Sequence, residues 1–265
     1  MTSSDEFQDL VQTLGRKAKE ASDILLNTRE EIINQVLRDC ATGLRRSNSI
    51  LLNKNVLDIK RAQDKKLKKA QIDRLSLNKD RIEAMACSLE AIAELKDPLK
   101  GVLESWTRPN GLKIEKISVP LGVLGLIYES RPNVTIDAAA LALKSHNAIM
   151  LRGGSEALGT SLALHDIMAQ ALKDNGLPED SVSIIRTPDR GIVTEMLHAD
   201  KYIDVMIPRG GTNLIERVMK EAKMPVFAHL DGICHVYVDR DADPQNAKDV
   251  VLNAKMRRTG ICGAA

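Results

Sequence analysis

The chain has 265 residues, of which 43% are hydrophobic and 2% aromatic, and its formal net charge is +2. This hydrophobic fraction is enough for an aliphatic core, so the composition excludes a wholly disordered chain. The near-neutral charge and the scarcity of aromatic residues argue against a dedicated nucleic-acid-binding protein, which needs uncompensated cations and stacking faces.

The first hundred residues carry apolar side chains at helical spacing. This periodicity predicts helices over residues 7–26, 28–63 and 78–95. Thr28 and Glu31 form a capping signal for the second helix, and Asp97-Pro98 ends the third. We expect residues 1–110 to be a helical segment that packs on the domain after it.

One stretch, residues 60–74, holds seven basic side chains and only two aspartates. We expect it to be a solvated face, because lysine and arginine side chains are mostly exposed. Contact with a polyanion or a membrane surface is the alternative.

From residue 111 onward, short β-branched segments alternate with helical ones. Strands are expected within 111–130 and at 148–151, 181–186, 202–208, 224–230 and 233–239. Helices are expected at 155–176, 190–199, 212–222 and 244–256. This alternation is typical of βαβ units and predicts a Rossmann-like α/β domain with a buried parallel sheet. Gly122 and Gly125 are expected to allow close packing of its strands.

Two junctions in this region share one pattern, in which a strand is followed by Arg-Gly-Gly, a hydroxyl residue and a helix. They are Arg152-Gly153-Gly154-Ser155 and Arg209-Gly210-Gly211-Thr212. The glycines let a ligand approach the backbone, and Ser155 and Thr212 are expected N-caps. Because a helix N-terminus offers unpaired N–H groups, both junctions are predicted to bind an anion, although Gly-Gly before a helix is often only a tight turn. The fingerprint G-x-G-x-x-G is absent.

The four cysteines show neither a C-x-x-C pair nor metal-ligand spacing, so we expect reduced thiols and no metal site. No signal peptide and no apolar run of roughly 20 residues is visible, which indicates a cytoplasmic protein without a membrane partner. Cys40, Cys87 and Cys234 are expected in the core. Cys262 follows Arg257 and Arg258 in "RRTGICGAA", a setting that favours a thiolate, although a lone cysteine is more often inert.

Three stretches, 119–154, 200–211 and 253–265, closely resemble the γ-glutamyl phosphate reductases, a family within the aldehyde dehydrogenase superfamily. The strings "IYESRPNVT" and "IPRGG" are specific to that family, and "ICGAA" matches the segment with its catalytic cysteine. The resemblance covers essentially the whole chain. It implies a cofactor domain over 111–254 and the start of a catalytic domain over 255–265. Since the family continues well beyond its cysteine, it also implies a truncated chain that turns over poorly or not at all.

The resemblance implies an activity, the NADPH-dependent reduction of L-glutamyl 5-phosphate to glutamate 5-semialdehyde in proline biosynthesis. Cys262 would attack the acyl phosphate and form a thioester, which is then reduced. A functional link to glutamate 5-kinase is implied, as is a homo-oligomer for the whole enzyme. The alternative is a catalytically incompetent NADP-binding remnant or one piece of a split gene. Another acyl-phosphate or acyl-CoA reductase is disfavoured by "YESRPN".

The resemblance also assigns cofactor residues. Arg152 matches a cation that holds the adenosine ribose, and Ser155 stands where NAD-preferring relatives carry an acid, which together imply NADP. The neighbouring Glu156 is an opposing charge. The implied cofactor set is Arg152, Gly153, Gly154, Ser155, Pro208, Arg209, Gly210, Gly211 and Thr212.

Substrate-side residues follow from the same resemblance. Asn133 lies near the superfamily's oxyanion asparagine, although the local spacing differs, and Arg131 and Arg258 are candidates for the substrate's phosphate or carboxylate. His229 stands closest to the glutamate that activates water in hydrolytic relatives. The missing glutamate implies a thioester that exchanges with phosphate rather than water, whereas His229 itself is expected only to cap a strand.

Overall fold

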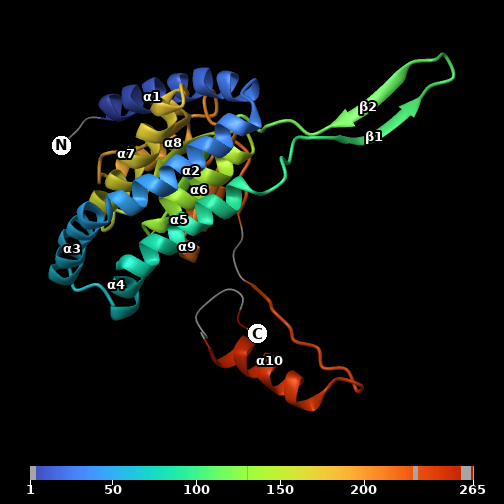
Figure 1. Cartoon of the computed structure of the whole chain (residues 1–265). Helices are drawn as coiled ribbons and strands as arrows, with labels where there is room; N and C mark the ends of the chain where they lie inside the picture. The colour runs from blue at the N-terminus through green and yellow to red at the C-terminus, as the bar shows by residue number, and fades with distance from the viewer. Residues whose placement is uncertain (1–3, 130, 229–231, 258–263, 265) are drawn as a thin grey trace. The chain divides into compact units, whose positions relative to one another are not determined.

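The computed structural model describes residues 4–129, 131–228, 232–257 and 264. The chain forms two compact units, Met1–Phe227 and Ala228–Ala265 (Figure 1). The domain boundaries expected at 110/111 and 254/255 stay a prediction.

The N-terminal region is helical, as predicted. Its helices are α1 (Ser4–Leu26), α2 (Glu30–Arg46), α3 (Asn48–Asp64), α4 (Lys69–Leu75) and α5 (Lys79–Ala93). The single helix expected over 28–63 is instead two, which meet at Ser47. The Thr28 capping signal is also wrong, because Arg29 is the N-cap and the Thr28 hydroxyl donates back to the carbonyl of Ile24 at 2.9 Å.

A four-stranded parallel sheet forms the centre of the first unit and confirms the predicted α/β class. Its strands are β3 (Val123–Tyr128), β4 (Ala148–Arg152), β5 (Val182–Ile184) and β6 (Val205–Arg209), in the order β5-β4-β3-β6. The connecting helices are α6 (Asn133–Lys144), α7 (Leu158–Asp174) and α8 (Gly191–Leu197), and α9 (Thr212–Glu221) follows β6. β3 and β4 are buried along their whole length, as a sheet covered on both faces requires.

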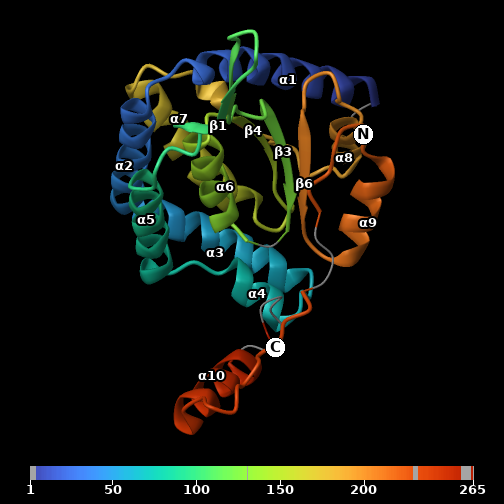
Figure 2. The same cartoon turned by 90° about the vertical axis from the view of Figure 1, so that its right-hand side faces the viewer.

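Helices cover the sheet in layers (Figure 2). α6 and α7 pack together beside β4 and β5, and α2 and α5 pack outside them, whereas α8 and α9 lie on the other side. α1 runs along the amino ends of the strands, where the Lys19 amino group is 2.6 Å from the Asp204 carboxylate. Close packing needs the predicted glycines here, because a Cβ atom at Gly122 would collide with Asp204 and one at Gly125 would lie 2.8 Å from Met206.

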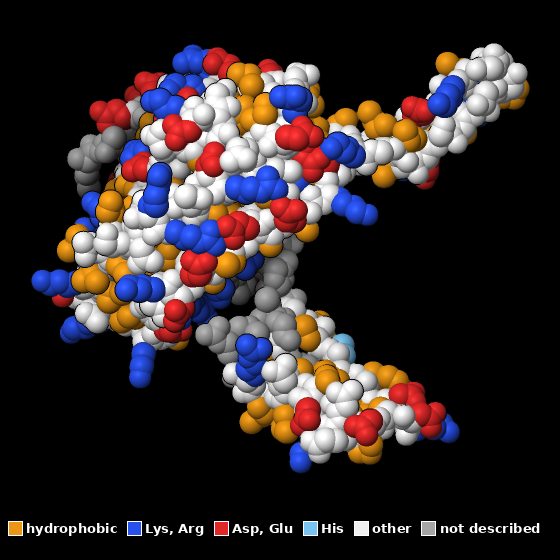
Figure 3. Space-filling view, in the orientation of Figure 1, with side chains coloured by type: hydrophobic (Ala, Val, Ile, Leu, Met, Phe, Trp, Pro, Cys, Tyr) orange, Lys and Arg blue, Asp and Glu red, His pale blue; other side chains and the backbone are white. Residues whose placement is uncertain are grey.

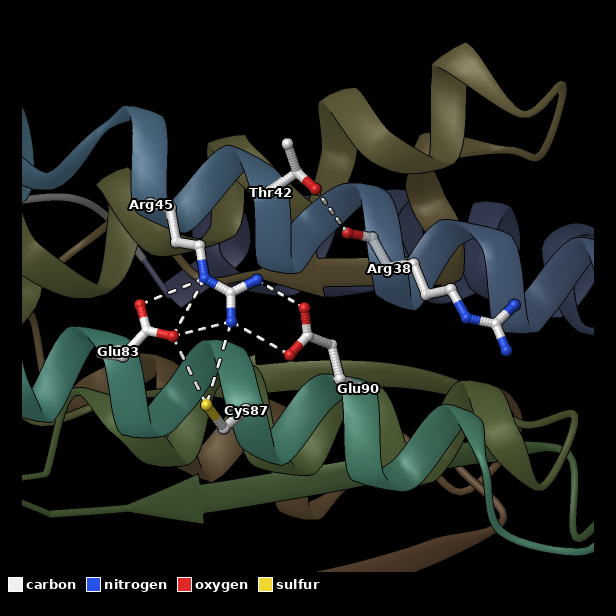
Figure 4. A network of polar contacts seen from close by, with 6 residues as sticks. All are labelled: Arg38, Thr42, Arg45, Glu83, Cys87 and Glu90. Carbon is white, nitrogen blue, oxygen red and sulfur yellow. Dashed lines mark hydrogen bonds and ion pairs between the residues drawn. The ribbon is translucent and has the colours of Figure 1, made fainter.

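Charged side chains of both signs are interspersed over the face formed by α2 and α5 (Figure 3). Arg45 of α2 lies between Glu83 and Glu90 of α5, with its Nη2 atom 2.7 Å from Glu83 Oε1 (Figure 4). Deeper in the unit, the side chain of Lys144 is 4% exposed, and its amino group lies 2.9 Å from the Glu30 carboxylate. Hydrogen bonds from Lys100 and Lys144 lower the pKa of Glu30 to about 2. This pair ties α2 to the end of α6.

Strands β1 (Val102–Thr107) and β2 (Lys113–Ile117) form a separate antiparallel hairpin, and all of β1 is exposed. β2 falls within a segment expected to contain strands, whereas β1 was not predicted.

The second unit contains α10 (Pro244–Met256), as predicted, and none of the residues of this helix is buried. Residues 232–239 form no strand, contrary to the prediction for 233–239, and Tyr237 is 85% exposed. The strand expected at 224–230 begins in the first unit, where its described residues form only an isolated bridge, between Val226 and Met206. Apolar alternation needs a neighbouring strand to become a sheet, and the second unit supplies none for 233–239 among its described residues.

Candidate functional site

Four loops follow the parallel strands at one edge of the sheet. They contain residues 129 and 131 after β3, 153–157 after β4, 185–190 after β5 and 210–211 after β6. The strand order reverses at β3, because β4 and β6 flank it on opposite sides. Ligands of open parallel sheets bind at the carboxyl edge near such a reversal. The structure therefore brings both Arg-Gly-Gly junctions to the edge where a ligand is expected.

Arg152, at the end of β4, is the most unusual side chain at this edge. Only 8% of it is exposed. Its Nη2 atom donates long hydrogen bonds, of 3.4 Å to the carbonyl of Pro188 and 3.5 Å to that of Asp189, and its Nε atom has no partner in the described part of the chain. Burial lowers the pKa of this guanidinium, and the Glu156 carboxylate offsets part of that effect. A buried cation with an unused donor is a physical reason to expect an anionic ligand.

The two glycines of the first junction pack against neighbouring side chains. A Cβ atom at Gly153 would lie 2.9 Å from the hydroxyl of Tyr128, which is itself bonded to Thr135 at 2.6 Å. A Cβ atom at Gly154 would collide with the carboxylate of Glu156. Gly153 is therefore needed for packing against the buried Tyr128, whereas a side chain at Gly154 would require only that the half-buried Glu156 side chain move.

The helix after the first junction begins later than expected. Ser155 is not its N-cap, because α7 starts at Leu158 with Ala157 as the N-cap. The acceptor comes from α3 instead: Asp58 Oδ2 accepts hydrogen bonds from the backbone N of Thr160 at 2.7 Å and from its hydroxyl at 2.8 Å. The predicted cap is wrong because a carboxylate 102 positions earlier in the chain occupies the helix N-terminus.

The second junction is open to solvent. Arg209, Gly210, Gly211 and Thr212 are all exposed, and Pro208 is buried in β6. Gly211 is the N-cap of α9, so the N-cap predicted at Thr212 is wrong by one residue. The backbone N of Gly211 donates to Glu129 Oε2 at 3.1 Å. No heavy atom of the described residues, chain neighbours aside, lies within 4 Å of a Cβ built on Gly211, so this junction has room for a ligand.

The start of α6 holds the candidate oxyanion donor. Asn133 is the first residue of this helix, and its Nδ2 atom donates to Asp137 Oδ2 at 2.9 Å, which engages one of its two amide hydrogens. Burial raises the pKa of Asp137, whereas Asn133 and Arg209 lower it. Asp137 therefore lies within electrostatic reach of the second junction. Arg131, just before α6, is half-buried.

The cysteine predictions have mixed outcomes. Cys262, the predicted nucleophile, lies outside the described residues. Cys40 is in the core, where burial raises the pKa of its thiol to about 12. The prediction for Cys87 is wrong: it is exposed on α5, 3.8 Å from Arg45, because it lies on the polar side of that helix. Cys234 is only half-buried.

Two more predicted residues, Arg258 and His229, also lie outside the described residues. Within the described ranges, no three His, Cys, Asp or Glu side chains gather so as to hold a metal ion. None of the helices in those ranges has the length and apolar character of a membrane span.

Three features of this edge escaped the sequence analysis. Glu129 contacts the second junction, Asp58 contacts the helix after the first, and the loop 185–190 contacts Arg152. Glu129 and the loop could have been found, because each follows a predicted strand at the carboxyl edge. Nothing in the sequence near residue 58 indicates its distant partner.

Comparisons with known proteins agree with this architecture. The sequence model described as "Aldehyde dehydrogenase family" matches residues 11–265. A protein of Paramagnetospirillum magneticum named gamma-glutamyl phosphate reductase is 50% identical over 264 residues, which is 100% of this chain and 62% of the relative. The crystal structure of the Thermotoga maritima gamma-glutamyl phosphate reductase is 41% identical, with a TM-score of 0.90, over 96% of this chain and 62% of that one.

A more distant structure shares only the fold. It is an engineered glycolyl-CoA reductase with bound NADP+, 17% identical, with a TM-score of 0.63 over 92% of this chain and 52% of that chain. The present chain thus spans about 62% of the length of the curated relative from Paramagnetospirillum.

Proposed function

The chain belongs to the aldehyde dehydrogenase family, and we propose that it carries the cofactor-binding region and the nucleophile of an NADPH-dependent γ-glutamyl phosphate reductase. The proposed reaction converts L-glutamyl 5-phosphate to L-glutamate 5-semialdehyde and phosphate, a step of proline synthesis. Its support is the 50% identity along the whole chain to a relative of that name, together with the buried cation at the edge of the sheet.

Cys262 is the proposed nucleophile. Its thiolate sulfur attacks the acyl carbon of the substrate, the bond from that carbon to the phosphate oxygen breaks, and inorganic phosphate leaves. The resulting thioester is reduced at the same carbon, and the carbon–sulfur bond then breaks to release the aldehyde and restore the thiolate. NADPH, when bound, supplies the hydride. Arg131 and Arg258 are proposed to hold the substrate's phosphate or carboxylate, and Asn133 to donate to the developing oxyanion.

The burial of Arg152 and the lack of a partner for its Nε atom among the described residues are the main support for the cofactor proposal. A phosphate of NADPH would provide the acceptor that its Nε atom lacks, and the long bonds from Nη2 to two carbonyls cost little to replace. Gly153, Gly154 and Ser155 follow it directly. Pro208, Arg209, Gly210, Gly211 and Thr212 are proposed to form the second side of the site, where Gly211 has open space.

NADP rather than NAD is proposed because Arg152 is a cation beside a small hydroxyl residue. Glu156 opposes this, since its carboxylate attracts the same guanidinium. Titration of the purified chain with NADPH and NADH, followed by nicotinamide fluorescence, tests the preference. We expect tighter binding of NADPH, and equal affinities would contradict the assignment.

The reaction is tested in reverse, with glutamate 5-semialdehyde, phosphate and NADP+. We expect formation of NADPH that requires phosphate and is abolished in the Cys262→Ser variant. NADPH binding without any turnover would favour the other reading, a cofactor-binding module. Turnover without phosphate would contradict an acyl-phosphate reductase. A link to glutamate 5-kinase and a homo-oligomer remain predictions of the resemblance, and a cytoplasmic location remains a prediction from the sequence.

A further inference from the structure

We propose that Asp58 is a positioning residue for the cofactor loop 153–157. This inference rests on the proposed function, but it concerns a residue of α3 that no comparison of the loop sequence would select. Asp58 has no exposed surface, and its carboxylate is not part of the sheet edge itself.

The contacts of Asp58 are directed at the first turn of α7. Thr160 donates two hydrogen bonds to Asp58 Oδ2, one from its backbone N–H at 2.7 Å and one from its hydroxyl at 2.8 Å. A Cβ atom at Gly159 would lie 3.0 Å from Asp58 Oδ1, so the carboxylate fits closely against the helix backbone. A carboxylate in this place stabilises the helix N-terminus through both hydrogen bonds and the helix dipole.

Asn55 and Arg61 complete the polar contacts around this carboxylate, Asn55 from a buried position and Arg61 with a side chain that is 60% exposed. Asn55, also on α3, donates to the Thr160 hydroxyl at 3.3 Å and to the carbonyl of Leu75 at 2.9 Å, and it accepts from the backbone N of Leu77 at 2.7 Å. Arg61 lies 3.1 Å from the second oxygen of Asp58. Such a network defines one arrangement, because a shift would leave buried polar groups without partners. The N-terminal helices therefore fix where α7 begins.

The start of α7 determines the geometry of the cofactor loop. Only five residues, 153–157, separate the end of β4 at Arg152 from the first residue of α7 at Leu158. The backbone N of Ala157 bonds to the carbonyl of Gly154 at 3.1 Å, which closes the loop into a turn. Glu156 lies within that turn, and its carboxylate attracts the Arg152 guanidinium, which partly offsets the effect of burial on the pKa of Arg152. Moving the helix start would therefore move Glu156 relative to the cation proposed to bind phosphate.

The test compares Asp58→Asn with Asp204→Asn in the whole chain. Asp204 is also a hydrogen-bonded carboxylate of the same unit, since it bonds Lys19 and the backbone N of Val123, but it lies at the opposite, amino edge of the sheet. Both variants are expected to unfold more easily. Only Asp58→Asn is expected to raise the Kd for NADPH, by about tenfold, the size expected from losing a charged helix cap.

A second measurement does not depend on the cofactor. Amide hydrogen exchange at residues 153–160 of the free protein is expected to quicken about tenfold in Asp58→Asn and to stay unchanged in Asp204→Asn. Thr160→Val, which removes only the hydroxyl donor, is the milder variant if Asp58→Asn folds poorly, and Thr160→Ser, which keeps both donors, should restore normal exchange and binding.

The outcomes are separable. Unchanged exchange at 153–160 in both Asp58→Asn and Thr160→Val overturns this inference, as does an equal rise in Kd in Asp204→Asn. Faster exchange in a chain whose unmodified form binds no NADPH would instead contradict the proposed function, and would restrict Asp58 to holding the loop.

Discussion

The β4–α7 and β6–α9 junctions share the sequence Arg-Gly-Gly at the same edge of the sheet, yet their surroundings are opposite. In the first, Arg152 and both glycines are buried, and the helix begins only at Leu158. In the second, Arg209 and both glycines are exposed, and the helix begins directly after Gly211. The same motif therefore places a buried, desolvated cation at one junction and an exposed, solvated cation at the other.

Each helix N-terminus is already in contact with a carboxylate of the chain, but the two carboxylates differ in kind. Asp58 is fully buried and accepts two short hydrogen bonds, so it belongs to the framework. Glu129 is exposed and, among the described residues, accepts a bond of 3.1 Å from Gly211, so a ligand anion can replace it at low cost. We infer that the first loop sets the position of the cofactor and that the second adapts to it.

Replacing a glycine in each loop is expected to give the largest difference in stability between the two loops. Gly153→Ala is expected to destabilise the fold by about 2 kcal/mol, because its Cβ atom would press on the buried ring of Tyr128. Gly211→Ala should cost less than about 1 kcal/mol, since the site is open and only the N-cap preference is lost. Urea denaturation of both variants provides the measurement. Equal losses of stability would show that the two loops are not differently packed.

Replacing Arg152 and Arg209 is expected to affect NADPH binding and folding stability differently. Arg152→Met should raise the Kd for NADPH about tenfold and yet raise the free energy of unfolding by about 1 kcal/mol, because it removes a buried, poorly paired charge. Arg209→Met should raise the Kd by only about threefold, since an exposed cation contributes little in water, and should lower stability only slightly, through the loss of its attraction to the Asp137 carboxylate. Fluorescence titration and thermal unfolding give the two quantities. A loss of stability in Arg152→Met would mean that its contacts to Pro188 and Asp189 are structural.

Local sequence signals predicted the position of both loops, but they did not predict the helix caps. The pattern of strand, Arg-Gly-Gly and helix correctly indicated two junctions of a parallel sheet, because β-branched runs and helical spacing are local properties. The caps at Ser155 and Thr212 were wrong for a different reason in each case. Asp58, from another helix, replaces the first, and Gly211 takes the place of the second because the helix begins at Thr212, one residue earlier than an N-cap at that residue requires.

Tertiary context also decided the elements away from the site. The apolar alternation at 233–239 predicts a strand, but the described residues of that unit offer no neighbour for it to pair with. The periodicity over 28–63 continues through Ser47, although the backbone there (φ −91°, ψ 12°) departs from the helical conformation and divides the segment into two helices. β1 was missed because its pairing partner, β2, supplies its stability rather than any burial of its own.

Glu129→Gln should change cofactor binding in the direction opposite to Asp58→Asn. Replacing the carboxylate by an amide removes a negative charge from the N-terminus of α9 and is expected to lower the Kd for NADPH about threefold. Glu104→Gln, in the β1–β2 hairpin, makes the same change of net charge and should leave the Kd as it is. If both variants bind NADPH equally well, the effect is one of net charge and Glu129 has no local role.

Asp137 gives the smallest expected effect and tests how far the second loop's charge extends. Burial raises its pKa above the ordinary aspartate value of 3.8, and the nearby Asn133 and Arg209 offset this only in part. In the folded state the ionised carboxylate is therefore disfavoured. The loss of stability from keeping Asp137 ionised in the folded state is present at neutral pH. It disappears as the pH falls through the raised pKa to below 3.8, where Asp137 is protonated in both the folded and the unfolded chain.

Asp137→Asn should accordingly stabilise the fold slightly at pH 7, by less than about 0.5 kcal/mol, and should have no effect at pH 3. Because Arg209 attracts the ionised form, the gain at pH 7 should be larger in an Arg209→Met background. Urea denaturation across this pH range in both backgrounds gives the answer. A gain that does not change with pH would mean that the amide improves packing, and that the exposed arginine of the second loop exerts no influence on α6.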